Sequence, residues 1–286
     1  MSLENFTENR IATDNGALYA RDYPGQGPAF VLMHGFPDNL HIYDQLIPYL
    51  VAAGRRVVAF DFLGFGASDK PGHGYSFAQQ LADLDAVVAA LQLDRIVPVV
   101  HDSSGPAGIN YSLAHPDRVA ALAILNSAYD DAYPVLWPEL VELFASPAFH
   151  ALAMTLAQTP AQFGWLLTWQ QKQFRDALPE ALASRFDAIT GPLIADNFMK
   201  AGSGPAFAQL AAQFHEELAR NTERLPELAA LDVPVKVIWG EHDPYITTAV
   251  GKDRASHFRD ASFVPVPAGH WLQSDLPEAV AHALLA

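Results

Sequence analysis

The sequence predicts an α/β fold in which a mostly parallel, twisted sheet is flanked by helices and carries an inserted helical lid. Short apolar runs alternate with helical patterns in residues 1–133, as is typical of right-handed parallel βαβ units. The alternation stops over residues 134–228, where every pattern is helical or irregular. Strand patterns resume in residues 229–286. We therefore divide the chain into a first part of the core (1–133), a lid (134–228) and a second part of the core (229–286).

The composition is that of a globular protein, and it disfavours some classes of binding partner. The chain has 286 residues, of which 50% are hydrophobic and 17% charged, so it can bury the core of one large domain. The net charge of −15 disfavours nucleic acid and anionic membrane surfaces as partners. The absence of cysteine excludes disulfides and a thiolate nucleophile. A polar, acidic N-terminus and the lack of an apolar run of about 20 residues predict a cytoplasmic protein without membrane insertion.

The strands and helices of the first part are predicted from hydrophobic periodicity and from residues that favour turns. Two segments in which apolar and polar residues alternate surround Asn15-Gly16, a dipeptide typical of a hairpin turn. Apolar runs indicate buried strands, and stripes of leucine and isoleucine indicate helices. The predicted strands are 10–13, 18–22, 29–33, 56–60, 96–100 and 122–125, and the predicted helices are 42–50 and 77–91.

The lid is predicted to be a set of short helices. Prolines interrupt its Phe-, Trp-, Leu- and Ala-rich sequence and should break it into pieces. An insertion of this size exceeds the usual length of a connection and indicates a functional role. Strands are expected again at 235–239 and 263–266.

Asp102 occupies a position that favours a nucleophile. It follows the buried run 96–100, and small residues such as Gly105 come next, before a helical pattern. A tight turn from strand to helix is the setting of a nucleophile elbow, whose apex residue is exposed and strained. A carboxylate there needs no base to deprotonate it and can attack an electrophilic carbon to form an ester.

Two other interpretations of this segment stay open. A frame shifted by one residue would make Ser103 the nucleophile, although it would place the large His101 where a small residue must pack under the turn. Asp102 could instead only cap the helix that follows.

Two further segments follow the last two strands. Asp243 lies just after 235–239, and His270 lies just after 263–266. Ligands of open α/β sheets bind beyond the carboxyl ends of the strands, so Asp102, Asp243 and His270 should meet there in the order nucleophile, acid, histidine. Asp130 and Asp131, after the strand 122–125, are rival positions for the acid. No histidine spacing indicates a metal site, and neither a metal nor a cofactor is expected.

Together these motifs resemble the α/β-hydrolase superfamily, in the branch that contains epoxide hydrolases and haloalkane dehalogenases. The resemblance runs from about Tyr23 to the C-terminus and is weakest in the lid. It implies that the backbone N–H groups of Phe36 and Ser103 form an oxyanion hole. It rests on His34-Gly35-Phe36-Pro37, Asp61-Phe62-Leu63-Gly64-Phe65-Gly66-Ala67-Ser68-Asp69, His101-Asp102-Ser103-Ser104-Gly105, Gly240-Glu241-His242-Asp243 and Gly269-His270-Trp271.

The sequence differs from the families that it resembles at positions that affect the reaction. Ser103 stands where haloalkane dehalogenases usually have a halide-binding tryptophan and where fluoroacetate dehalogenases have an arginine. Epoxide hydrolases carry lid tyrosines that protonate the epoxide oxygen, but all nine tyrosines here lie outside 134–228. The candidates for this proton donor are therefore Tyr129, Tyr133, His150 and His215. Trp137, Trp165 and Trp169 are candidate pocket residues.

The function expected from the sequence is a cofactor-independent hydrolase acting through an ester on Asp102. The apolar lid indicates that its partners are a small, hydrophobic, uncharged substrate and water. Epoxide hydrolysis is the first choice, because His-Gly-Phe-Pro favours it and no tryptophan follows Asp102. The alternatives are haloalkane dehalogenation, ester hydrolysis through Ser103, and ligand binding without catalysis. The sequence leaves open whether the protein is a monomer or a homodimer.

Overall fold

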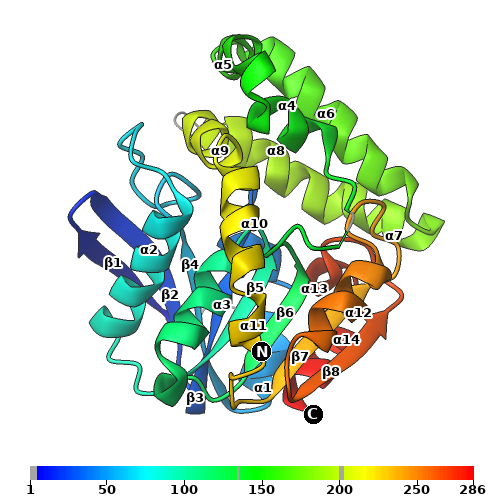
Figure 1. Ribbon diagram of the computed structural model, residues 1–286. Helices are drawn as coiled ribbons and strands as arrows, with labels where there is room; N and C mark the ends of the chain where they lie inside the picture. Colours follow the sequence, from blue (N-terminus) through cyan, green and yellow to red (C-terminus); the bar gives the residue numbers. More distant parts are fainter. Residues whose placement is uncertain (1–4, 134, 200–202) are drawn as a thin grey trace.

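One eight-stranded sheet, with strand order β1-β2-β4-β3-β5-β6-β7-β8, forms the centre of the molecule (Figure 1). The computed structural model describes residues 5–133, 135–199 and 203–286. β1 and β2 pair antiparallel, β2 also runs antiparallel to β4, and all other neighbours are parallel. The strands are β1 (Thr7–Thr13), β2 (Gly16–Tyr23), β3 (Gln26–Met33), β4 (Arg55–Asp61), β5 (Ile96–Asp102), β6 (Leu122–Ser127), β7 (Val235–Gly240) and β8 (Ala261–Val266).

The prediction of a mostly parallel sheet flanked by helices is confirmed. β5 and β6 are almost wholly buried, because helices cover both of their faces. Such strands appear in the sequence as continuous apolar runs, which is why they could be predicted. The helix predicted over 42–50 is wrong in part: the chain forms a 3₁₀ turn over Leu40–Tyr43, and α1 begins only at Ile47. Pro48 lies in the first turn of α1, where its missing N–H costs no hydrogen bond.

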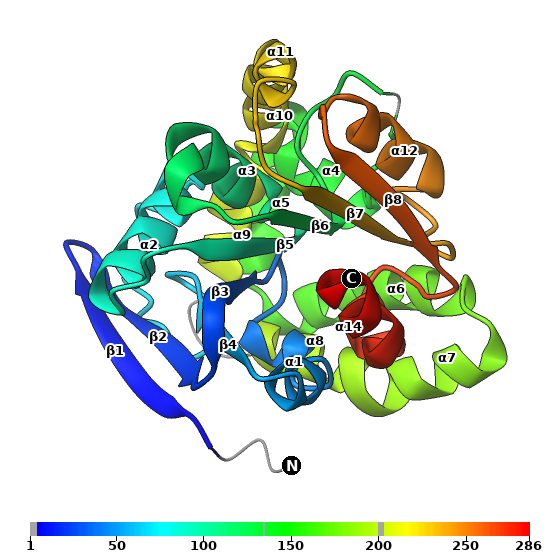
Figure 2. The same ribbon diagram turned by 90° about the horizontal axis from the view of Figure 1, so that it is seen from below.

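Helices cover the sheet from both sides. α2, α3 and α12 pack on one face, and α1 and α14 pack on the other (Figure 2). Their bounds are α1 (Ile47–Ala52), α2 (Phe77–Ala90), α3 (Gly105–Ala114), α12 (Thr248–Ser256) and α14 (Pro277–Leu285), with a short α13 (Leu272–Asp275) and a 3₁₀ turn over Pro116–Arg118.

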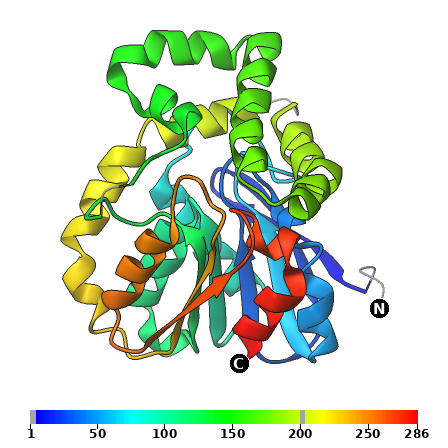
Figure 3. The same ribbon diagram turned by 90° about the vertical axis from the view of Figure 1, so that its right-hand side faces the viewer.

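Between β6 and β7 the described residues contain only helices and loops, and most of these helices lie over the carboxyl ends of the strands (Figures 1 and 3). Prolines stand at helix starts here: α4 begins after Pro138, α6 at Pro160 and α7 after Pro179. The helices are α4 (Glu139–Ala145), α5 (His150–Ala157), α6 (Pro160–Asp176), α7 (Glu180–Arg185), α8 (Gly191–Met199), α9 (Ser203–Ala211), α10 (Phe214–Glu223) and α11 (Leu225–Leu228), with a 3₁₀ turn over Pro147–Phe149 and a π-helical turn over Phe186–Thr190.

None of the helices in the described part of the chain is by itself long and apolar enough to cross a membrane, although Glu139–Ala145 and Pro147–Ala157, bent by 80°, pass that test as a pair.

A buried side chain connects the helices between β6 and β7, here called the helical layer, to the core. Asn197 of α8 is fully buried and accepts a hydrogen bond from the backbone N–H of Gly66 at 3.0 Å. Its amide nitrogen donates to the carbonyl oxygens of Pro37 at 2.6 Å and Asp38 at 2.8 Å. Because both loops follow neighbouring strands of the sheet, α8 is held directly above the strand ends.

Candidate active site

Asp102 is the last residue of β5 and stands at the apex of a sharp turn into α3. Its φ is +53°, a left-handed conformation that costs a non-glycine residue energy and is common at functional sites. The loop after β3 approaches closely, because a Cβ on Gly35 would lie 2.1 Å from Asp102 Oδ1. The N-cap of α3 is Ser104, without a side-chain capping bond, so the interpretation of Asp102 as a helix cap is wrong.

The two carboxylate oxygens of Asp102 have different partners. Oδ1 accepts a hydrogen bond from the backbone N–H of Phe36 at 2.9 Å, and the backbone N–H of Ser103 also helps to lower the pKa of this carboxyl. Oδ2 faces His270 Nε2 at 3.3 Å. One oxygen therefore faces a backbone N–H donor, while the other faces the histidine.

Asp243 holds the opposite side of the His270 ring. His270 Nδ1 and Asp243 Oδ2 are 2.7 Å apart, and both side chains are buried. Asp243 is itself fixed by Asn126 Nδ2 at 2.8 Å and by the backbone N–H of Tyr245 at 3.0 Å. Asn126 carries no charge and was not a candidate for the acid, but its side chain fixes the position of Asp243.

Neither rival carboxylate reaches His270. Asp130 forms a buried ion pair with Arg254, and Asp131 accepts a hydrogen bond from the hydroxyl of Thr222. The structure therefore brings Asp102, Asp243 and His270 together and leaves Asp130 and Asp131 elsewhere.

Burial and charge set the protonation states of the pair at the centre. Burial alone would raise the pKa of Asp102, but the hydrogen bond and charge of His270 outweigh it and lower the pKa. Burial alone would lower the pKa of His270, yet the charge of Asp243 and the hydrogen bonds to Asp102 and Asp243 raise it to about 10. At neutral pH an imidazolium thus faces the carboxylate of Asp102.

A second buried cluster lies beneath the site. His101 Nε2–H donates to the carbonyl oxygen of His270 at 3.0 Å, and burial followed by the charge of His270 lowers the pKa of His101 to about 3. Asp38 accepts from Trp271 Nε1 at 2.9 Å, and burial followed by the charge of Asp102 raises its pKa to about 7. Sequence reasoning missed Asp38, whose only signal was its place directly after the His-Gly-Phe-Pro segment.

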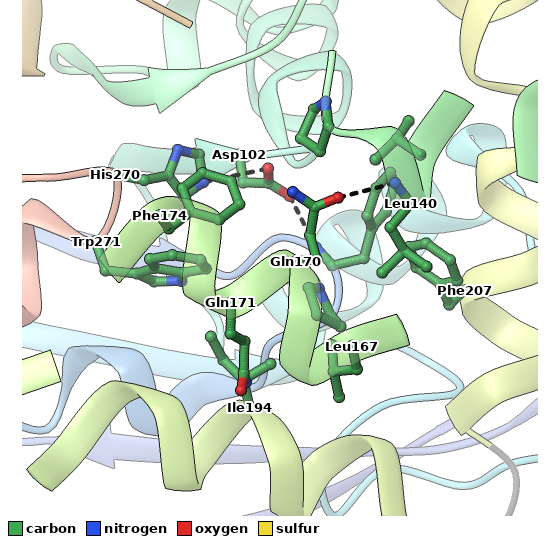
Figure 4. Close-up of a pocket in the computed structure, with 14 residues that line it drawn as sticks. Asp102, Leu140, Leu167, Gln170, Gln171, Phe174, Ile194, Phe207, His270 and Trp271 are labelled. Carbon is green, nitrogen blue, oxygen red and sulfur yellow. Dashed lines mark hydrogen bonds and ion pairs between the residues drawn. The ribbon is translucent and has the colours of Figure 1, made fainter. Parts of the chain in front are cut away.

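A narrow cavity lies over Asp102 and His270. Its first lobe, of about 40 Å³, continues between Leu167, Ile194 and Phe207, and a second lobe, of about 20 Å³, shares Asp102 and His270 with it. Figure 4 shows His270 on one side of the Asp102 carboxylate and Gln170 of α6 on the other. The remaining walls are mostly apolar, and no lysine or arginine from the described residues lines either lobe.

The predicted pocket tryptophans occupy different places. Trp137 lines the second lobe and packs edge-on against Phe214, with ring centroids 4.8 Å apart. Trp165 and Trp169 line a separate groove on the outside of α6, where Trp165 is 67% exposed. Ser103 is buried and does not line the cavity, and its hydroxyl accepts from the N–H of Phe36 at 3.1 Å.

The four proton-donor candidates are not brought to the cavity. The hydroxyl of buried Tyr129 donates to Asn110 at 3.0 Å, and Tyr133 is 36% exposed. His150 is exposed, and His215 lies at the surface beside Glu142, at 3.2 Å. The cavity wall holds Tyr245 and Gln170 instead. Sequence reasoning missed both, because Tyr245 lies outside the lid and Gln170 is one glutamine among many.

Comparison with known proteins finds relatives of several activities. A fluoroacetate dehalogenase from Burkholderia sp is 40% identical over 107 residues, which are 36% of this chain and only 35% of that protein. Epoxide hydrolase 3 from Xenopus tropicalis is 27% identical over 89% of this chain and 70% of its own length. A haloalkane dehalogenase from Mycobacterium marinum is 27% identical over 96% of this chain and 90% of its own length.

The fold recurs in solved structures and in a family model. A thermophilic esterase from Thermogutta terrifontis superimposes with a TM-score of 0.76 at 20% identity, covering 98% of this chain and 96% of the esterase. The model of the alpha/beta hydrolase fold matches residues 28–277. Since that match spans most of the sequence, the chain belongs to the alpha/beta hydrolase fold family.

Proposed function

We propose that the protein is a cofactor-independent hydrolase that opens small, uncharged epoxides through an ester on Asp102. One observation carries the proposal: the two oxygens of the Asp102 carboxylate face different groups. Oδ2 lies 3.3 Å from His270 Nε2, and Oδ1 lies 2.9 Å from the backbone N–H of Phe36. A carboxylate held in this way has one oxygen for attack and one already in an oxyanion hole.

In the first step Asp102 Oδ2 attacks a ring carbon of the epoxide, and the bond from that carbon to the ring oxygen breaks. The electron pair of that bond stays on the opened oxygen, which takes up a proton, so the product of this step is an alkyl ester of Asp102 that carries a hydroxyl group. Ester formation removes the negative charge beside His270. Since that charge and its hydrogen bond help to raise the pKa of His270, the pKa falls, the imidazolium releases its proton to solvent, and the neutral ring can then act as a base.

In the second step His270 takes a proton from water, and the water oxygen adds to the carboxyl carbon of Asp102. Negative charge develops on Oδ1, where the N–H groups of Phe36 and Ser103 stabilise it. The bond between the carboxyl carbon and Oδ2 then breaks, and His270 protonates Oδ2 as the diol leaves. Asp102 keeps the oxygen that came from water.

The walls of the cavity support an uncharged and small substrate. The first lobe measures about 40 Å³ and the second about 20 Å³, and neither is lined by a lysine or arginine of the described residues. A substrate carboxylate would be buried there without a partner, at a high cost in free energy. The similarity to a fluoroacetate dehalogenase therefore does not extend to a carboxylate-bearing substrate.

Haloalkane dehalogenation is the second candidate. Trp137 lines the second lobe, and an indole N–H is a donor that suits a leaving halide. Ester hydrolysis through Ser103 has less support, because Ser103 lies outside the cavity wall and His270 faces Asp102.

The ester itself is the experimental test. In His270→Gln the base is absent, so incubation with 1,2-epoxybutane should add one substrate mass to Asp102, detectable by peptide mass spectrometry. With wild-type enzyme in excess and water labelled with ¹⁸O, the diol of a single turnover should be unlabelled and Asp102 should gain the label.

Parallel assays assign the substrate class. We expect the enzyme to turn over 1,2-epoxybutane faster than 1-bromobutane or 4-nitrophenyl acetate. Label found in the diol after one turnover would rule out the ester. Preferred bromide turnover would indicate the dehalogenase. Ester cleavage that survives Asp102→Ala would indicate Ser103, and saturable binding of the epoxide without turnover would indicate a binding protein.

A further inference from the structure

Three polar side chains meet where the helical layer contacts the core at the edge of the cavity. The hydroxyl of Tyr245, in the loop between β7 and α12, donates to Glu139 Oε2 at 2.6 Å. Gln170 of α6 donates from Nε2 to the Tyr245 oxygen at 2.7 Å. Glu139 is the first residue of α4. The group therefore joins one core loop to two helices of the overlying layer.

The direction of these hydrogen bonds is fixed by the backbone. The N–H of Leu140 donates to Gln170 Oε1 at 2.9 Å, so the amide nitrogen of Gln170 must be the atom that faces Tyr245. Because an amide nitrogen only donates, the Tyr245 oxygen accepts from it, and the phenol proton points to Glu139. Figure 4 shows the amide of Gln170 with its oxygen turned to Leu140.

This hydrogen-bonded group links bulk water to the cavity wall. Tyr245 and Gln170 are only 6% and 4% exposed, whereas Glu139 is exposed. Tyr245 lines the second lobe, which Asp102 and His270 also line. Tyr245 therefore connects an exposed carboxylate to the wall of the lobe.

The position of Tyr245 is tied to that of the catalytic acid. Its backbone N–H donates to Asp243 Oδ1 at 3.0 Å, so the loop that presents the acid also presents the phenol. Its ring packs on Phe174 with centroids 4.9 Å apart, and Phe174 in turn lies 5.3 Å from the His270 ring.

We propose that Tyr245 is the acid that protonates the leaving oxygen when Asp102 opens an epoxide, with Gln170 and Glu139 as its positioning residues. This inference rests on the proposed function. As Asp102 Oδ2 bonds to carbon, the electron pair of the broken C–O bond stays on oxygen, the hydroxyl of Tyr245 turns from Glu139 towards that oxygen, and the oxygen takes the phenol proton. Gln170 stabilises the resulting phenolate through its N–H, and Glu139 returns a proton drawn from water.

The chemistry is favourable at neutral pH. Burial first, and then the hydrogen bond and charge of Glu139, raise the pKa of Tyr245, so its proton is retained until a stronger base appears. The alkoxide of an opened epoxide is such a base. A leaving bromide needs no proton, and this difference separates the role of Tyr245 from a merely structural one.

The test compares Tyr245→Phe with its parent in the His270→Gln background, where the ester accumulates. The rate of ester formation is measured by mass spectrometry with 1,2-epoxybutane and with 1-bromobutane. We expect the epoxide rate to fall by about 100-fold and the bromide rate to stay unchanged. Tyr129→Phe is the matched control, because that phenol lies outside the cavity wall, and both of its rates should equal the parent's.

Glu139→Gln in the otherwise wild-type chain tests the return of the proton. Its side-chain oxygen can still accept from Tyr245, so the first turnover on the epoxide should keep its rate while steady-state turnover slows. Gln170→Leu removes the donor to the phenolate and should slow the epoxide step but not the bromide step.

The results also distinguish this inference from the function on which it rests. Equal loss on both substrates in Tyr245→Phe would assign the phenol a structural role, and no loss on either would remove it from the reaction. In both cases the ester mechanism stands and Tyr245 is not its acid. If the parent forms an ester only with the bromide, the epoxide proposal fails and this inference fails with it. If no substrate adds to Asp102, the ester mechanism itself is wrong.

Discussion

Asp102 combines a strained backbone with a side chain that its surroundings stabilise as an anion. A φ of +53° costs a residue with a Cβ on the order of 1 kcal/mol or more. The hydrogen bond from Phe36 and the charge of His270 act in the opposite direction, because they favour the ionised carboxylate. These contacts therefore keep Asp102 ionised, as the proposed attack on an epoxide requires.

The first prediction concerns Asp243, whose charge is the largest influence that raises the pKa of His270. In Asp243→Asn the pKa of His270 should fall, and the ring should lose the partner that fixes its orientation. We expect kcat to drop by about four orders of magnitude, as for the loss of the acid in other triads. The measurements are NMR titration of His270 and steady-state kinetics.

Asp131→Asn serves as the control, since Asp131 also follows the preceding strand but bonds to Thr222 rather than to His270. Its activity should match that of the wild type. An active Asp243→Asn enzyme with an unchanged pKa of His270 would show that the acid has been assigned to the wrong residue.

The loop after β3 and the turn after β5 are packed so closely that only glycine fits between them. A Cβ at residue 35 would lie 2.1 Å from Oδ1 and 2.3 Å from Cβ of Asp102, well inside van der Waals contact. This approach brings the N–H of Phe36 to 2.9 Å from Oδ1. The proposed oxyanion hole therefore depends on the spacing of two elements as well as on its own donors.

The second prediction follows from that spacing. Gly35→Ala should push the two loops apart and lower kcat by about 100-fold, because misplacement by about 1 Å has effects of this size. Gly164→Ala is the matched control: it lies in α6, and its added Cβ would meet nothing within 4 Å. That variant should keep full activity and gain about 0.5–1 kcal/mol of stability from helix propensity. A fully active Gly35→Ala enzyme would contradict the close approach.

At the scale of the whole molecule, buried carboxyls set how stability changes with pH. Burial raises the pKa of Asp83 to about 6 and the pKa of the fully buried Asp38 to about 7. Each binds a proton more tightly in the folded than in the unfolded chain, so stability rises as pH falls through these values towards about 4. The raised pKa of His270 acts in the same direction at higher pH, because its stabilisation is full below about 6.5 and is lost towards 10.

The third prediction uses Asp83, which accepts hydrogen bonds from the N–H of Leu63 and from Gln79 and lines neither lobe of the cavity. Asp83→Asn should be more stable than the wild type at pH 8, by about 3 kcal/mol at most, and the difference should vanish near pH 4. Thermal unfolding followed by circular dichroism across this range measures it. Asp94→Asn, which changes an exposed side chain, is the matched control and should keep the stability of the wild type. A constant offset for Asp83→Asn would mean that burial does not govern its titration.

The sequence allowed the sheet to be predicted because strands buried on both faces appear as continuous apolar runs, as β5 and β6 do. The meeting of Asp102, Asp243 and His270 could be predicted because parallel strands end at one edge. The contacts of the helical layer could not be predicted from the sequence. Its aromatic residues are frequent, and only packing decides that Trp137 faces the cavity while Trp165 faces outwards.

The two lobes of the cavity are unlike, and this has a stereochemical consequence for the proposed reaction. Tyr245 lines the second lobe, whereas Leu167 and Phe207 line the first. An attacked carbon must lie between Asp102 and the leaving oxygen, so the oxygen points to the phenol and the alkyl arm enters the first lobe. The mirror-image epoxide would direct its oxygen to apolar walls. An enzyme built in this way consumes one enantiomer of a racemic epoxide and leaves the other behind.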